Sequence, residues 1–154
     1  MARPAYKLFR LIYHSRQTQM VLGDLDAHVH AIIERSIPNN QRFMLTGLLI
    51  VVQGSFLQVL EGPEAAVRGA YCRIVDDPRH DQIAIISGEE AQTRLFGQWN
   101  MCARALASAD QSILDVLDSK GLFDPARLTP KSAVDLLRKV ADIQSRNTQT
   151  LMID

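Results

Sequence analysis

Two segments of the chain carry polar side chains that could hydrogen-bond to each other and to a bound heteroaromatic ring. Tyr13 and Ser15 share one face of an alternating segment, and Gln58 is a single amide in an otherwise apolar run. A buried amide without partners costs about 1–3 kcal/mol, so a buried Gln58 would need neighbours such as a phenol and a heteroaromatic ligand. The pattern also allows Gln58 to be a surface-facing residue of an ordinary alternating strand.

A pair of amides and a pair of large side chains have both an ordinary and a functional interpretation. Asn39 and Asn40 follow a predicted helix and a proline. They form either a turn, because Asn tolerates left-handed backbone, or hydrogen bonds to the edge of a planar ligand. Trp99 and Met101 alternate onto one face, a pattern more typical of core packing than of cofactor contact.

A cluster of charged residues lies at the C-terminal end of the predicted helix that stops near residue 76. Its members are Arg73, Asp76, Asp77, Arg79 and His80. They either form a charged helix end or, through Arg73 with Arg79 or His80, a phosphate site, since guanidinium groups suit phosphate oxygens.

Common enzyme motifs are missing from the sequence, which has no GxGxxG, P-loop, HExxH or GxSxG. His28 and His30 are two apart on a predicted helix and cannot share a face, so metal ligation is not expected. Cys72 and Cys102 have no CxxC spacing. We expect both to be buried, reduced thiols, with a disulfide or redox pair as the alternative.

Length and composition predict a small globular protein. The chain has 154 residues, 47% of them hydrophobic, with 17 basic and 17 acidic side chains. This balance argues against broad attraction to nucleic acid or anionic lipid. No apolar run reaches transmembrane length, and the N-terminus lacks the apolar stretch of a signal peptide. We expect a cytoplasmic protein with neither nucleic-acid nor membrane partners.

Hydrophobic periodicity predicts the order strand–helix–strand–strand–helix–strand. The strands are predicted at 6–15, 45–52, 56–61 and 82–87, with a tight turn at 53–54 and a short fifth strand at 99–103. One helix runs from Asp24 to about 36–38, and another begins at 62–64, with Pro63 as its first helical residue, and stops at 76–78. The second helix has an apolar face at helical spacing, formed by Val67, Ala70, Tyr71 and Ile74. This order predicts an α+β, ferredoxin-like βαββαβ sheet with two helices on one face.

Beyond residue 107 the pattern becomes helical. Asp110 can cap one helix, and Thr129-Pro130 can begin a second. Both have apolar faces that must pack on the free face of the sheet or on another subunit. The sequence therefore divides into residues 1–105 and a two-helix extension at 106–154.

Taken together, these segments resemble the BLUF family, blue-light sensors that use FAD. The resemblance covers residues 6–103 and rests on these motifs: Tyr13 with Ser15, Asn39-Asn40, Thr46-Gly47-Leu48-Leu49, the run FLQVLEGP at 56–63, Asp77-Pro78-Arg79-His80, and Arg94-Leu95-Phe96 leading to Trp99-x-Met101. It identifies residues 1–105 as a flavin-binding photosensor domain and 106–154 as an extension for output or oligomerisation.

The resemblance implies an FAD site between the two helices that cover the sheet. The ring would lie near Ile32 and Ile74, with Asn40 and in part Asn39 at its polar edge. The residues toward the ribityl-phosphate end would be Arg73, Asp77, Arg79 and His80.

The resemblance also implies how light acts. Tyr13 and Gln58 would be the photochemical pair, because an amide has a donor at one end and an acceptor at the other. Reorganising it would give a slightly red-shifted state that decays in the dark. The signal would leave through Trp99 and Met101, with Ser15 in the relay, toward the C-terminal helices.

We therefore expect a short, stand-alone photoreceptor that is not an enzyme and that self-associates through its C-terminal helices. Its partner would be a separate protein, either response-regulator-like or a cyclic-di-GMP phosphodiesterase. The alternatives are a flavin-dependent oxidoreductase on the same fold, for which a nicotinamide fingerprint is missing, and a binding or assembly module without flavin.

The chain departs from the family pattern at several positions. The loop at 16–23 is longer, and Met44-Leu45 replaces a common Gly-Ile. Gly97 stands where Pro is usual, and Cys102 where Gly is common. The last two lie at the proposed output strand, so its flexibility and the recovery kinetics are where we expect this chain to differ.

Overall fold

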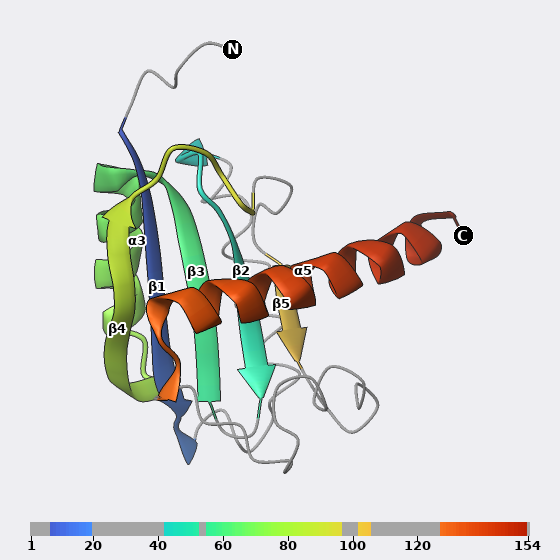
Figure 1. Cartoon of the computed structure of the whole chain (residues 1–154). Coiled ribbons are helices and arrows are strands. Elements are labelled where there is room, and N and C mark those ends of the chain that lie inside the picture. Colours follow the sequence, from blue (N-terminus) through green and yellow to red (C-terminus); the bar gives the residue numbers. More distant parts are fainter. Residues whose placement is uncertain (1–6, 20–41, 53–54, 97–101, 106–126, 154) are drawn as a thin grey trace.

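A five-stranded sheet with a helix on each face forms the part of the chain that the computed structural model describes, residues 7–19, 42–52, 55–96, 102–105 and 127–153 (Figure 1). The strands are β1 (Leu8–Gln17), β2 (Thr46–Val52), β3 (Ser55–Pro63), β4 (His80–Glu90) and β5 (Cys102–Ala105), and the helices are α3 (Glu64–Val75) and α5 (Pro130–Ile153). The helices predicted from Asp24 and Asp110 and the turn at 53–54 lie outside the described residues.

The strand order β4-β1-β3-β2-β5 confirms the predicted ferredoxin-like α+β fold. The first four strands pair antiparallel, and β5 adds to the edge of β2 in a parallel pairing. β4 begins at His80 rather than at residue 82, because His80 still pairs with Gln17 of β1. The fifth strand, predicted at 99–103, is described at Cys102–Ala105.

The alternation predicted for β1 places its side chains in two separate cores. Tyr13 and Leu11 face α3, and Ile12 belongs to the core that α5 covers. In β2, Leu48 and Leu49 are both buried but in different cores, so both faces of this apolar strand are covered. The sheet is therefore a partition between two apolar layers.

The spacing predicted for α3 is also confirmed. Val67 and Ala70 are buried, and Tyr71 packs against the same cluster. Pro63 does not open the helix but precedes it: its φ of −56° and ψ of 136° are extended, so it still continues β3. Cys72, which we expected to be buried, is an exposed free thiol, because the residue after an inward-facing Tyr71 turns away from the sheet.

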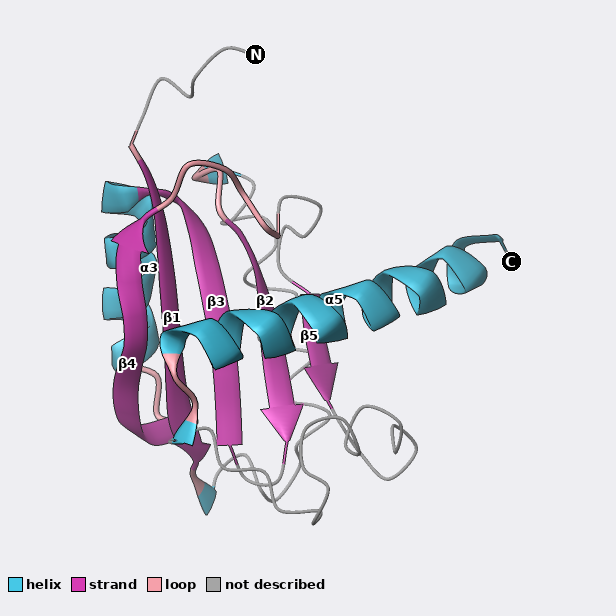
Figure 2. Ribbon diagram, in the orientation of Figure 1, coloured by secondary structure: helices cyan, strands magenta, loops and turns pink. Residues whose placement is uncertain are grey.

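α5 begins where the sequence predicts and packs on the free face of the sheet. Thr129 caps it, with its Oγ1 accepting a hydrogen bond from the Ser132 N–H at 3.1 Å, and Pro130 takes the first helical position. Among the side chains of α5 that the structure describes, those buried are Ala133, Leu136, Leu137, Val140 and Ala141. Figure 2 shows α5 crossing the sheet from β1 toward β5 and continuing past it. None of the helices in the described ranges is long and apolar enough to cross a membrane.

Candidate functional site: a tyrosine–glutamine pair under helix α3

Tyr13 and Gln58 are cross-strand neighbours on the face of the sheet that α3 covers. They occupy paired positions of β1 and β3, and both are buried, at 2% and 6% exposure. The Tyr13 hydroxyl donates a hydrogen bond to Gln58 Oε1. Gln58 therefore has the phenol partner that its burial requires, and the alternative of a surface-facing residue is wrong.

Burial keeps the Tyr13 phenol protonated. Loss of solvent raises the pKa of Tyr13 far above its usual range, and the neighbouring Tyr71 and Asp77 act in the same direction. A neutral phenol keeps its proton and serves as a donor. Because the Gln58 amide turns its oxygen to this phenol, its NH2 group points away from Tyr13.

Aromatic rings fix the position of Tyr13 by edge contacts. The Tyr71 ring of α3 lies 5.6 Å from the Tyr13 ring at an interplanar angle of 64°. The His80 ring lies 6.3 Å from Tyr13, and it also meets Phe56 of β3 at 6.1 Å. Such edge-to-face contacts stabilise one ring orientation, so the hydroxyl of Tyr13 is held in place.

His80 ties β1 to the end of α3. Its Nε2 donates to the Ile74 carbonyl at 2.6 Å, and its Nδ1 lies 2.7 Å from Ser15 Oγ. Both ring nitrogens of His80 therefore have a hydrogen-bond partner, one on α3 and one on β1. The structure thus brings Ser15, Ile74 and His80 together beside Tyr13, and Ile74 packs in the same cluster.

The other members of the predicted phosphate cluster have different partners: Asp77 and Arg79 pair with each other, and Arg73 does not join them. Asp77 accepts hydrogen bonds from the Arg79 N–H and Nη1, both at 2.9 Å, as in a charged helix end. Arg73 instead lies over the exposed Phe43 ring, 5.9 Å from its centroid, and makes no hydrogen bond or ion pair with any residue the structure describes. Cofactor contacts for these side chains stay a prediction.

The remaining predicted site residues lie outside the described residues. They are Ile32, Asn39, Asn40, Trp99 and Met101. Within the described ranges, no three His, Cys, Asp or Glu side chains gather closely enough to hold a metal ion.

Sequence reasoning missed a second polar centre, on the α5 face. Glu61 is fully buried, at 0% exposure, and pairs with Arg10 of β1 at 2.8 Å. The signal was present in the alternation of β3, since Leu57, Val59 and Glu61 share one face. An acid in an apolar row predicts a buried, paired carboxylate.

The fold and this site define an α+β domain of ferredoxin-like topology with a buried, hydrogen-bonded Tyr–Gln pair under one helix. The model of the family BLUF, described as sensors of blue-light using FAD, matches residues 8–102. The chain belongs to this family. The matched region is accordingly a sensor and not a catalytic domain.

Relatives with curated descriptions include large light-regulated proteins. Photoactivated adenylate cyclase subunit beta of Euglena gracilis is 35% identical over 95 residues, 61% of this chain and 11% of that protein. The blue light- and temperature-regulated antirepressor BluF of Escherichia coli (strain K12) is 39% identical over 62 residues, 40% of this chain and 15% of that protein. The chain therefore spans only a small part of these relatives.

Solved structures confirm the fold. BlrB, a BLUF protein in its dark state, superposes with a TM-score of 0.72 at 27% identity and covers 89% of this chain and 97% of its own. BlsA in its photo-activated state gives a TM-score of 0.76 at 21% identity, and the match covers 87% of this chain and 94% of that one. Klebsiella pneumoniae BlrP1 with FMN and cyclic diGMP gives a TM-score of 0.56 at 30% identity, and the match covers 74% of this chain and 28% of that one.

Proposed function

We propose that this chain senses blue light with bound FAD, through a reversible rearrangement of the hydrogen bonds among Tyr13, Gln58 and the flavin. The observation that carries the proposal is the buried hydrogen bond from Tyr13 to Gln58 Oε1. It is a neutral donor–acceptor pair in an apolar layer, where hydrogen bonds are strong and water does not compete.

The residues present fit a flavin. The Gln58 amide offers a donor end beside a phenol, and Ile74 offers an apolar surface in the same cluster. Arg73 keeps a guanidinium without an acidic partner among the described residues, which suits a phosphate. Ile32, Asn39, Asn40, Asp77, Arg79 and His80 complete the proposed set. Bound FAD would supply blue-light absorption and, once excited, a strong electron acceptor.

Tyr13 and Gln58 can exist in two hydrogen-bonded arrangements. In the one described, the phenol keeps its proton and donates it to the amide oxygen. Turning the amide over presents its NH2 group to the Tyr13 oxygen and directs the amide oxygen to the other side. The pair can therefore exchange the donor and acceptor groups that face its neighbours without a change in charge. Neither glutamate nor leucine at position 58 could do this.

The proposed output passes from this site to the C-terminal region and a separate protein. Residues 1–105 would be the sensor and 106–154 the extension for output and self-association. Phe96 packs in the same core as α5, and Trp99 and Met101 follow it three and five positions later in the sequence. A cyclic-di-GMP phosphodiesterase or a response-regulator-like protein is the proposed partner; the structure of the relative BlrP1 with cyclic diGMP supports the former class.

The absorption spectrum of the FAD-loaded protein before and after blue light tests this function. We expect a small, reversible red shift, and its loss without loss of flavin in Tyr13→Phe. Tyr71→Phe removes a hydroxyl from the adjacent ring and is the matched control, which should keep the shift. A normal shift in Tyr13→Phe would contradict the mechanism, and steady oxidation of NADH would favour a flavin-dependent oxidoreductase.

A further inference from the structure

We infer that Glu61 is a positioning residue for the output segment: its buried carboxylate holds residues 93–96 on the sheet, and so connects the strand of Gln58 to Phe96 and α5. This inference rests on the proposed function for its role in signalling. The anchoring itself rests on the contacts alone and can be measured in the dark.

The carboxylate of Glu61 accepts hydrogen bonds from the backbone of the segment that follows β4. Oε2 accepts from the Leu95 N–H and Oε1 from the Phe96 N–H, both at 2.8 Å. Arg10 Nε also donates to Oε2 at 2.8 Å. Two consecutive backbone donors and one guanidinium thus converge on a side chain that has no exposed surface.

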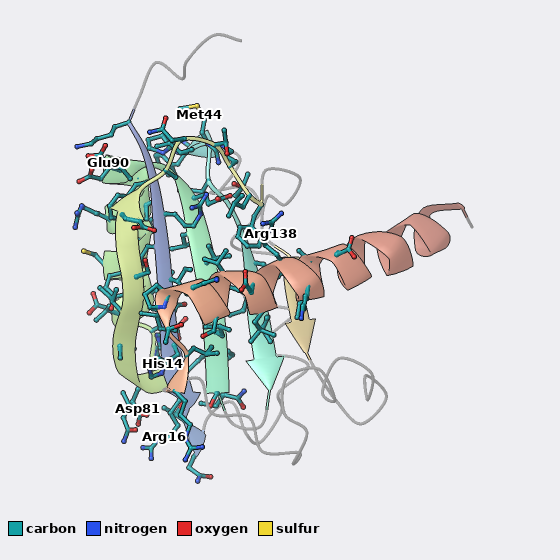
Figure 3. The ribbon with its side chains drawn as sticks, in the orientation of Figure 1. His14, Arg16, Met44, Asp81, Glu90 and Arg138 are labelled. Atoms are coloured by element: carbon teal, nitrogen blue, oxygen red, sulfur yellow. The ribbon has the colours of Figure 1, made fainter. Side chains whose placement is uncertain are left out.

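Two arginines extend this anchor to three strands and the same segment. Arg10 of β1 donates through Nη2 to the Thr93 carbonyl at 2.8 Å. Arg94 donates to Thr46 Oγ1 of β2 at 2.7 Å, to the Glu61 carbonyl of β3 at 3.1 Å, and to the Met44 carbonyl at 2.7 Å. Met44 lies at the end of the sheet opposite Asp81 (Figure 3).

The position of Glu61 in β3 links the two sides of the sheet. Gln58 faces the α3 core, and Glu61, three positions on, faces the α5 core. Phe96, held by the Glu61 carboxylate, is 1% exposed and packs with α5. A displacement of β3 at Gln58 would therefore reach Phe96 through one strand and one carboxylate.

Only a carboxylate fits this position. Four donors converge on two oxygens: Arg10 Nε, the Leu95 and Phe96 N–H groups and, at 3.5 Å, the Thr46 hydroxyl. A glutamine has one oxygen and an NH2 group that would face a donor. Glu61→Gln should therefore release the Leu95 or Phe96 amide while nearly keeping the volume of the side chain. Glu64→Gln is the matched control, because the Glu64 carboxylate lies at the surface and pairs with Arg68 at 3.0 Å.

The experiment uses the full chain loaded with FAD and has a dark arm and a light arm. In the dark, hydrogen exchange at the Leu95 and Phe96 amides should become about tenfold faster in Glu61→Gln and stay unchanged in Glu64→Gln. In the light, Glu61→Gln should keep the red shift but lose the light-induced amide I infrared bands of the protein backbone.

Unchanged exchange at residues 95 and 96 would overturn the anchoring, and full amide I bands in Glu61→Gln would overturn the role in signalling. A wild-type protein without a red shift would contradict the proposed function instead, and the dark arm would still decide the anchoring. If Glu61→Gln does not fold, Arg10→Met with Glu61→Met removes both charges together, a change that buried ion pairs generally tolerate. The same faster exchange is expected there.

Discussion

The two faces of the sheet hold different kinds of buried polar group. Under α3 the groups are a phenol, an amide, a hydroxyl and an imidazole ring, and the first three can each donate and accept. Under α5 the centre is a carboxylate whose oxygens receive donors from Arg10 and from two backbone N–H groups. The first kind can exchange donors for acceptors, and the second cannot. One strand, β3, thus carries a rearrangeable residue and a fixed one.

Removing the cation from the α5 face should have the largest effect on stability. Arg10→Met leaves the buried Glu61 carboxylate without its charge partner, which costs about 3–5 kcal/mol. Urea unfolding measures this loss. Arg16→Met is the control: Arg16 pairs with Asp81 at 3.0 Å, but both side chains are exposed (Figure 3), so its effect should be far smaller. Equal losses of stability in Arg10→Met and Arg16→Met would contradict the view that the buried Arg10–Glu61 pair matters more than the exposed Arg16–Asp81 pair.

Removing a neutral partner from the α3 face should cost less. Ser15→Ala deprives His80 Nδ1 of its hydrogen bond, at a cost of about 1–3 kcal/mol for a buried group left unpaired. Ser87→Ala, on β4, removes a hydroxyl that makes no hydrogen bond with the described residues and should be nearly neutral. A loss for Ser15→Ala as large as that for Arg10→Met would contradict the comparison.

Alkaline pH should weaken the protein through Tyr13. The pKa of its phenol is raised by burial, so above pH 10 the unfolded chain releases a proton that the folded protein keeps. Stability is then lost as pH rises, by about 1 kcal/mol between pH 10 and pH 11 for one such phenol, and is unaffected below that range. Unfolding midpoints at pH 9 and pH 11 should converge in Tyr13→Phe. An unchanged pH dependence in this variant would assign the effect to other groups.

The smallest expected effect concerns the backbone that meets Arg94. Met44 has a φ of 59°, a left-handed conformation that costs a non-glycine residue about 1–2 kcal/mol, and its side chain is exposed. Met44→Gly should raise the free energy of unfolding by about 0.5–1 kcal/mol, because the relief of strain is partly offset by the larger conformational entropy of glycine in the unfolded chain. Met44→Ala keeps the left-handed strain and should not raise the free energy of unfolding. If Met44→Ala stabilised the protein as much as Met44→Gly, relief of backbone strain could not be the cause.

Short-range patterns predicted the parts of the molecule that depend on one element at a time. The alternation of β1 placed Tyr13 on one face, and the helical spacing of α3 placed Val67 and Ala70 inward. The cap at Thr129 followed from its sequence. Each of these depends on the period of a strand or helix and on the residue types next to it.

Contacts between residues far apart in the chain could not be read in the same way. The bond between Ser15 and His80 joins positions 65 residues apart and depends on the register of β1 with β4, which shifts between His14 and Arg16. Two of the donors to Glu61 are the backbone N–H groups of residues 95 and 96, and a backbone donor cannot be recognised from the residue type that carries it. Met44 has a left-handed backbone that a methionine does not prefer, and its carbonyl accepts a hydrogen bond from Arg94, 50 residues away.

The light-minus-dark absorption spectrum of Gln58→Leu, measured beside the wild type at equal FAD content, tests the central claim most directly. Leucine keeps the burial at position 58 but removes both ends of the amide that meets Tyr13. The account predicts a reversible red shift in the wild type and none in Gln58→Leu. A red shift of normal size in Gln58→Leu would contradict it.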